Sequence, residues 1–126
     1  MRRACALYPG RIACGIDAKD GRVAVRGWVE TSDVGPVELA LRMRDAGVRD
    51  VIYTDIRRDG MQGGPNVEST AELVRRTNLR VIGSGGVGTI QDLYDLKNAG
   101  CAGAIVGKAL YNGNFTLAQA LELEAE

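Results

Sequence analysis

Short apolar runs alternate with amphipathic stretches along most of this chain. The runs are continuously apolar and have the length of buried strands. They are Arg11–Ile16, Val51–Thr54, Arg80–Gly83 and Ala104–Val106. Amphipathic stretches with helical spacing follow, namely Pro36–Ala46, Asn66–Arg76, Thr89–Ala99 and Thr116–Leu123. A strand followed by a helix four times predicts an α/β fold, in which helices cover a parallel sheet.

The ends of the predicted helices carry residues that favour helix starts and stops. Pro36 suits a first helical turn, and Gly47 suits a C-terminal stop. Asn66 and Thr89 are suitable N-caps, because their side-chain oxygens can accept hydrogen bonds from free backbone N–H groups. Gly100 is expected to end the third helix.

An internal repeat supports the same architecture. The segment Asp45–Tyr53 (DAGVRDVIY) aligns with Asn98–Val106 (NAGCAGAIV), and each reads as a helix end, a glycine cap and the next strand. The spacing corresponds to one βαβα unit. Such a repeat is expected of a barrel and also arises in doubly wound sheets, so it supports the α/β class more firmly than it supports a barrel.

Two glycine-containing segments indicate a phosphate site. In Val81–Val87 (VIGSGGV) and Ala104–Leu110 (AIVGKAL), a short strand runs into glycine and then into a helix, which presents backbone N–H groups to an anion. Two such loops in succession recur after strands seven and eight of (β/α)8 barrels. A whole barrel takes roughly 200 to 250 residues, and this chain has 126. The sequence therefore resembles the second half of a barrel.

The amino-acid composition excludes several classes of partner and of catalytic site. With 45% hydrophobic residues, 25% charged residues and zero net charge, nothing in the balance indicates nucleic acid or a membrane surface as a partner. We expect a cytoplasmic protein, because no apolar run suits a membrane span or a signal peptide. The three cysteines are widely spaced and predict neither a disulfide framework nor a zinc site. Histidine is absent, which excludes Ser-His and Cys-His nucleophiles.

Polar residues stand where the first two predicted strands end. Asp17 follows the first strand, and Thr54 and Asp55 close the second. In a barrel the carboxyl ends of the strands face the active site, so Asp17 and Thr54 would be neighbours on the rim that carries the phosphate loops. A carboxylate directly after an apolar strand is well placed for proton transfer. By contrast, Asp20-Gly21 reads as a turn, because Arg22–Trp28 alternates like a small hairpin strand.

Six segments carry a resemblance to a known family. They are Gly15–Gly21 (GIDAKDG), Val23–Trp28 (VAVRGW), Tyr53–Gly60 (YTDIRRDG), Gly64–Asn66 (GPN), Gly83–Val87 (GSGGV) and Val106–Tyr111 (VGKALY). In this order they resemble the phosphoribosylformimino-5-aminoimidazole carboxamide ribotide isomerases of histidine biosynthesis. The resemblance covers nearly the whole chain. It implies that residues 1–126 form the C-terminal half of a (β/α)8 TIM barrel, with four βα units corresponding to strands five to eight.

A paralogous family shares the fold and the phosphate loops. It is the cyclase subunit of imidazole glycerol phosphate synthase. That subunit differs from this chain at Gly27–Trp28, Thr54–Asp55 and Val106–Leu110. The isomerase family is therefore favoured.

The resemblance implies an Amadori rearrangement, which converts an N-linked aminoaldose into an aminoketose within a substrate that carries two phosphates. An acid opens the ribose ring and a base moves a proton from C2, so no metal or organic cofactor is required. By position, Asp17 resembles the general acid, while Thr54 and Asp59 resemble residues that orient the sugar. The implied substrate-binding residues are Arg26, Trp28, Asp55 and Gly64, and the implied phosphate-binding residues are Ser84, Gly85, Gly86, Gly107 and Lys108.

Two alternatives stay open. Trp28 either stacks on the imidazole or forms an apolar patch on the hairpin. The chain is either one half of the isomerase or a non-catalytic, phosphate-binding half-barrel. In the family, the partner aspartate lies after strand one and the second phosphate site lies after strands three and four, outside the resemblance. An open half-barrel would expose strand edges and its inner face, so we expect association with an N-terminal half or with itself.

Overall fold

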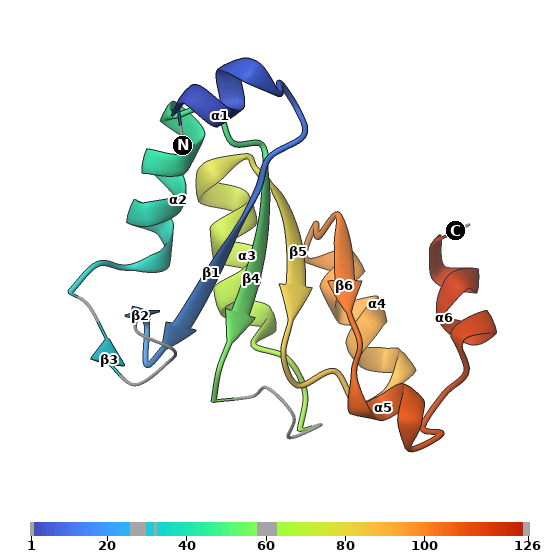
Figure 1. The fold of residues 1–126 in the computed structure, drawn as a ribbon. Helices are drawn as coiled ribbons and strands as arrows, with labels where there is room; N and C mark the ends of the chain where they lie inside the picture. The colour runs from blue at the N-terminus through green and yellow to red at the C-terminus, as the bar shows by residue number, and fades with distance from the viewer. Residues whose placement is uncertain (1, 26–29, 32, 58–62, 125–126) are drawn as a thin grey trace.

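A computed structural model describes residues 2–25, 30–31, 33–57 and 63–124, and every structural statement below refers to these residues. The helices are α1 (Arg2–Leu7), α2 (Pro36–Asp45), α3 (Val67–Thr77), α4 (Ile90–Asn98), α5 (Lys108–Tyr111) and α6 (Leu117–Glu124). The strands are β1 (Ala13–Lys19), β2 (Arg22–Val25), β3 (Glu30–Thr31), β4 (Asp50–Asp55), β5 (Arg80–Ser84) and β6 (Gly103–Ile105). Figure 1 shows their arrangement. None of the described helices is long and apolar enough to cross a membrane.

One sheet organises the chain, in the order β3-β2-β1-β4-β5-β6. The pairs β1–β4, β4–β5 and β5–β6 are parallel. Each parallel strand therefore lies beside the next parallel strand in the chain. The pairs β1–β2 and β2–β3 are antiparallel and form a hairpin extension at one edge. The predicted α/β class and the parallel pairing are confirmed, and the arrangement is consistent with a TIM-barrel family.

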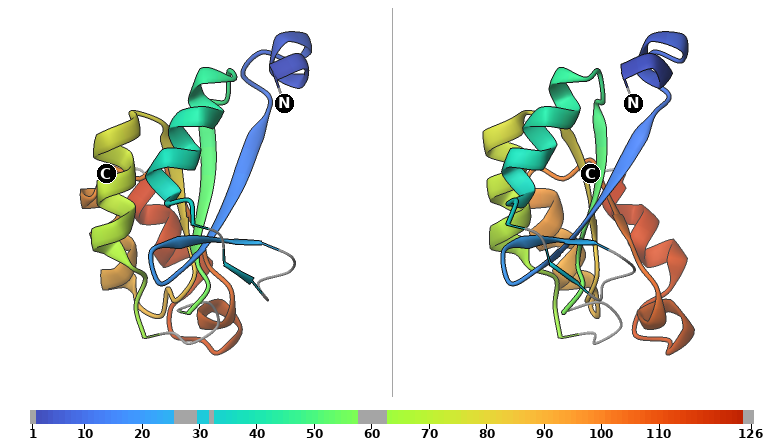
Figure 2. Two further views of the ribbon diagram at one scale, coloured as in Figure 1. Left: turned by 90° about the vertical axis from the view of Figure 1, so that its left-hand side faces the viewer. Right: turned by 60° about the vertical axis from the view of Figure 1, so that its left-hand side comes forward.

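The helices α2, α3 and α4 all lie on the same face of the sheet (Figure 2). Burial along β1 alternates accordingly: Cys14, Ile16 and Ala18 are buried, while the residues between them are more exposed. Gly83 of β5 also faces the helices, since a Cβ at this position would lie 3.1 Å from Leu96 Cδ2 of α4. Helix α6 lies beyond the β6 edge, where Lys97 Nζ of α4 donates to the Leu123 carbonyl at 2.6 Å (Figure 1). The described helices α2, α3 and α4 therefore cover one face of the sheet, and no described helix lies on the opposite face, which we call the open face.

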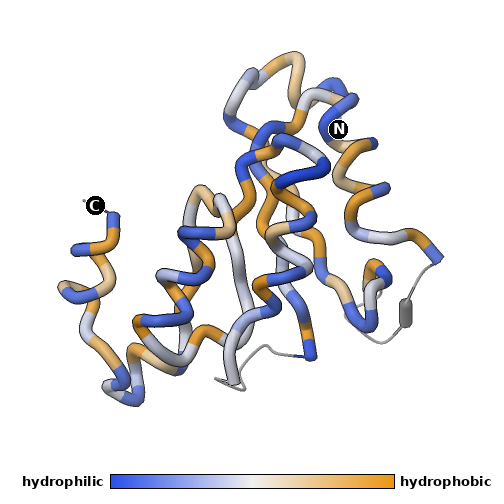
Figure 3. Tube along the Cα trace, turned by 180° about the vertical axis from the view of Figure 1, so that it is seen from behind, coloured by the Kyte–Doolittle hydropathy of each residue, from blue (hydrophilic) through white to orange (hydrophobic). Residues whose placement is uncertain are grey.

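The hydrophobic core lies between the sheet and the helices, in two clusters. The first joins β1, β4 and β5 to α2 and α3, and Ile16, Val51, Val81 and Leu73 are at most 1% exposed there. The second lies under α4, α5 and α6 and contains Leu96. Seen from the helical side, hydrophobic and hydrophilic residues alternate along these helices, as expected when only one side of a helix is buried (Figure 3).

The predicted helix ends are confirmed. Asn66 caps α3 by accepting a hydrogen bond from the Ser69 N–H, and Thr89 caps α4 in a reciprocal capping box with Asp92. Gly47 follows α2 with a φ of 108°, and Gly100 follows α4 with a φ of 92°. Both lie in the left-handed region that glycine favours, which stops each helix and turns the chain into the next strand.

The bounds of the first predicted strand were wrong. Strand β1 continues to Lys19, so Asp17 lies within the strand rather than after it. The cause is pairing on both sides of the strand: Asp17 and Ala18 pair with β4, and Ala18 and Lys19 pair with β2, which extends β1 beyond the apolar run. Asp20, with a φ of 55°, and Gly21 form the turn between the two strands, as predicted. Of the predicted hairpin strand, Arg22–Val25 forms β2 and residues 26–28 lie outside the described residues. Helix α1 was not predicted, whereas α5 is the helix expected directly after Gly107.

Truncating a fully buried helix residue should destabilise the fold through a cavity. Leu73 of α3 is 1% exposed, so Leu73→Ala should lower the free energy of unfolding by about 2–5 kcal/mol. The matched control Leu7→Ala removes the same atoms from a side chain that is 63% exposed and should change it by less than about 0.5 kcal/mol. Urea unfolding measures both, and equal effects would contradict the core described above.

Candidate active site

Three polar residues form one row across the open face of the sheet. Asp17 of β1 pairs with Thr54 of β4, and Thr54 pairs with Ser84 of β5. Neighbouring strands lie about 4.8 Å apart, and register partners point to the same face. The structure therefore brings these three predicted residues together, near the carboxyl ends of their strands. Thr54 is buried, whereas Asp17 and Ser84 are half-buried.

The two predicted phosphate loops leave the sheet side by side. Ser84 of β5 pairs with Ile105 of β6. Gly86 lies two residues after Ser84, and Gly107 lies two residues after Ile105, so the two loops begin at the same level of the sheet. Gly85 and Gly86 have φ values of 95° and 86°. These values are common for glycine but rare for residues that carry a side chain. Gly107 is the N-cap of α5, and Lys108 is its first residue. The glycines after β5 are buried, whereas Gly107 and Lys108 are exposed.

Hydrogen bonds from several elements hold the loop after β5. The Gly64 N–H donates to the Gly86 carbonyl at 2.9 Å. The N–H groups of Gly88 and Thr89 donate to Asp92 Oδ2 at 2.9 and 3.1 Å. The predicted substrate-binding residue Gly64 thus contacts the glycine loop after β5 through its main chain.

Asp55 lies on the helix-facing side of β4, away from the row. Its Oδ1 accepts a hydrogen bond from the Arg57 N–H at 3.1 Å, and its Oδ2 accepts one from Asn66 Nδ2 at 2.9 Å. Burial, with a smaller contribution from the Asp55 charge, raises the pKa of the adjacent Tyr53. The Asp55 carboxylate therefore connects both ends of the segment between β4 and α3, and its role in substrate binding stays a prediction.

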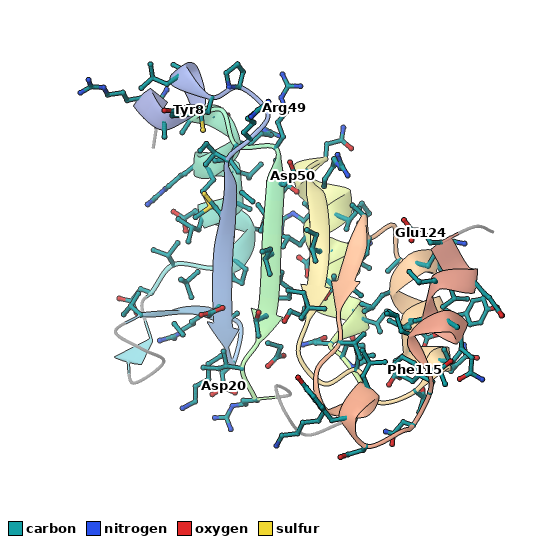
Figure 4. The ribbon with its side chains drawn as sticks, turned by 45° about the vertical axis from the view of Figure 1, so that its right-hand side comes forward. Tyr8, Asp20, Arg49, Asp50, Phe115 and Glu124 are labelled. Atoms are coloured by element: carbon teal, nitrogen blue, oxygen red, sulfur yellow. The ribbon has the colours of Figure 1, made fainter. Side chains whose placement is uncertain are left out.

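An exposed ion pair joins two loops at the carboxyl end of the sheet. Arg57 Nη2 donates to Asp20 Oδ2 at 2.7 Å, which links the β1–β2 turn to the segment after β4. This hydrogen bond holds the pKa of Asp20 below its usual value. Figure 4 shows Asp20 at the end of the sheet opposite Arg49 and Asp50. Because both partners are exposed, the pair orients the loops and adds little to stability.

The predicted residues Arg26, Trp28 and Asp59 lie outside the described residues. Sequence reasoning also missed supporting residues. The spacing of Thr89 and Asp92 is that of a capping box, which is a local signal for Asp92. Asn114 Nδ2 donates to the Gly88 carbonyl at 2.8 Å across 26 positions of the chain, and no local pattern signals such a contact.

Removing the Asp55 carboxylate should destabilise the segment between β4 and α3. Asp55→Ala leaves the half-buried Asn66 amide without this acceptor, so the free energy of unfolding should fall by about 1–3 kcal/mol. The control Asp33→Ala breaks the ion pair between Asp33 and Arg22, in which the Asp33 side chain is fully exposed, and it should leave the free energy of unfolding almost unchanged. Chemical denaturation measures both, and an Asp55→Ala effect no larger than the control would refute this role.

Comparison with known proteins places the chain in a family. The model of the family described as "Histidine biosynthesis protein" matches residues 1–116. A relative from Granulibacter bethesdensis is 54% identical over 97% of this chain and 51% of its own length. One from Rhodospirillum centenum is 53% identical over 99% of this chain and 52% of its own length.

Both relatives are named 1-(5-phosphoribosyl)-5-((5-phosphoribosylamino)methylideneamino) imidazole-4-carboxamide isomerase. The chain spans about half the length of the curated relatives it matches. With this match over most of its length, the chain belongs to the histidine biosynthesis protein family.

Proposed function

We propose that this chain supplies half of a (β/α)8 barrel and half of the active site of a histidine-biosynthesis isomerase. The enzyme would convert the N-linked phosphoribosyl aminoaldose of the imidazole carboxamide ribotide into its aminoketose, the phosphoribulosyl form. The observation that carries the proposal is the row Asp17–Thr54–Ser84, which lies beside two glycine loops at the carboxyl end of a parallel sheet. The names of relatives at about half sequence identity support it.

The row suits the chemistry of this rearrangement. Asp17 is proposed to donate a proton to the ring oxygen as the ribose opens, and Thr54, the register partner of Asp17, is proposed to hold the sugar hydroxyls. Asp59 is proposed to orient the sugar from the segment after β4. The base that removes the C2 proton would come from an aspartate of the complementary half. Proton transfer between such groups uses no metal or organic cofactor.

The two glycine loops are proposed to hold one substrate phosphate. The carbonyl of Gly86 accepts from Gly64, and the carbonyl of Gly88 accepts from Asn114, so both carbonyl oxygens are engaged by protein donors. A loop whose carbonyls are held in this way can direct other peptide N–H groups toward an anion. The exposed Lys108 adds a positive charge from the β6 side.

The open face supports pairing with a second half-barrel. Ile52 and Ile82 pair across this face, and Ile105 of the edge strand is 45% exposed. A groove of about 610 Å³ lies between α4, β6 and α6 and is lined mainly by apolar side chains, including those of Leu93, Val106 and Leu121. Apolar surface next to an unpaired strand edge favours association. The proposed partner is an N-terminal half of the kind that full-length relatives contain, or a second copy. The expected cytoplasmic location stays a prediction.

The second candidate is a non-catalytic half-barrel that binds phosphate and assembles with itself. It would use the glycine loops and the open face but not Asp17. A gene for a complementary half, with an aspartate at the end of its first strand, would favour the isomerase.

Turnover should require a complementary half and Asp17. The isolated chain should show little or no isomerase activity, and adding the N-terminal half of a full-length relative should restore it. In that complex, Asp17→Asn should lower kcat by a factor on the order of 10² to 10⁴. The control Asp95→Asn changes a carboxylate on the outer helix α4 and should leave kcat unchanged. Full activity of Asp17→Asn would show that Asp17 is not the acid, and full activity of the isolated chain would show that no second half is needed.

Phosphate binding should survive in the isolated chain and depend on Gly86. Phosphate at ten times its Kd should stabilise the fold by about 1.4 kcal/mol, which raises Tm by a few degrees. Gly86→Val should remove this shift, because its side chain occupies the space an oxyanion would use. Valine at a φ of 86° also strains the backbone.

The control for this strain is Gly10→Val. Gly10 has a φ of 74° and open space around it, and it lies at the other end of β1. This variant should melt at a lower temperature but keep the phosphate shift. Thermal melting at matched ionic strength measures all three proteins. An equal shift in wild type and Gly86→Val would place the anion elsewhere.

A further inference from the structure

Asn114 connects the two glycine loops from outside the set of predicted site residues. It lies in the connection between α5 and α6. Its side-chain Nδ2 donates to the carbonyl of Gly88 at 2.8 Å, in a contact that is partly buried. Gly88 lies two residues after Gly86, so this bond reaches the end of the loop that follows β5.

The position of Asn114 is fixed from the side of β6. Its backbone N–H donates to the carbonyl of Ala109 at 3.0 Å, within the short helix α5 that begins at Lys108. The next residue, Phe115, is 4% exposed and packs in the cluster under α4 (Figure 4). Asn114 therefore moves with Gly107 and Lys108 while its side chain holds the other loop.

The loop after β5 is thereby held on two sides. The Gly64 N–H binds the Gly86 carbonyl from the β4 side, and Asn114 binds the Gly88 carbonyl from the β6 side. The peptide N–H of Gly88 is held by Asp92 Oδ2. Since the peptide unit is planar, holding the Gly86 carbonyl fixes the direction of the Val87 N–H, whereas the Thr89 N–H that follows the Gly88 carbonyl donates to Asp92 Oδ2 at 3.1 Å. A carbonyl that loses its donor can rotate, and its partial negative charge repels an anion nearby.

We propose that Asn114 is a positioning residue for phosphate binding, which sets the loop after β5 against the loop after β6. The inference rests on the proposed phosphate site and adds to it a residue that does not itself contact the anion. Phosphate affinity, and not only stability, therefore depends on the Asn114 amide.

The test is a titration of the full chain with inorganic phosphate, followed by NMR well below the Tm of each variant. Asn114→Leu keeps a similar volume but cannot donate a hydrogen bond, and it should raise the phosphate Kd about tenfold. Asn114→Ser, a smaller change that shortens the side chain, should raise Kd in the same direction. It keeps the inference testable if the leucine variant does not fold.

The matched control is Lys97→Met. Lys97 Nζ also makes a bond to a main-chain carbonyl 26 positions away, that of Leu123, but it joins α4 to α6 away from the loops. This variant should lower Tm and leave the phosphate Kd unchanged. A wild-type chain that binds no phosphate overturns the proposed site and this inference together. Wild-type binding with an unchanged Kd in both Asn114 variants overturns the positioning role alone.

Discussion

The register between the parallel strands is the constraint on which the rest of this structure depends. Val51 and Val81 are register partners, are fully buried and face the helices. Because side chains alternate along a strand, this burial places Thr54 of β4 and Ser84 of β5 on the open face. A slip of one residue would exchange the two faces, bury polar groups against the helices and disperse the row that begins at Asp17. Hydrophobic burial on one side of the sheet therefore fixes the position of the candidate chemistry on the other side.

Around that row, polar contacts hold the loops in addition to the apolar packing of Val87. Asp55 holds both ends of the segment between β4 and α3, and Asp92 holds the end of the glycine loop. Carboxylates that accept from backbone N–H groups make strong, directional bonds. A loop held in this way keeps a defined shape, which is what an anion site requires.

Local signals made much of the fold predictable. The caps at Asn66 and Thr89, the glycine after α2 and the order of strands and helices all rest on residues close in sequence. What was missed depends on pairing between strands: β1 continues beyond its apolar run because Asp17 and Ala18 pair with β4, and Ala18 and Lys19 pair with β2. Likewise, the adjacency of Asp17 and Thr54 was expected from the fold class, whereas the bond between Asp55 and Asn66 joins a strand to a helix cap and has no local signal.

The proposed chemistry and the open face both require a second half-barrel. The rearrangement needs one group to give a proton and another to take one, and the row places Asp17 on a face that no described helix covers. A second sheet closing over Ile52 and Ile82 would bury apolar surface and would bring its own strand ends to the same rim. Association and completion of the site are then a single event, so the apolar residues between the halves would control activity without touching the substrate.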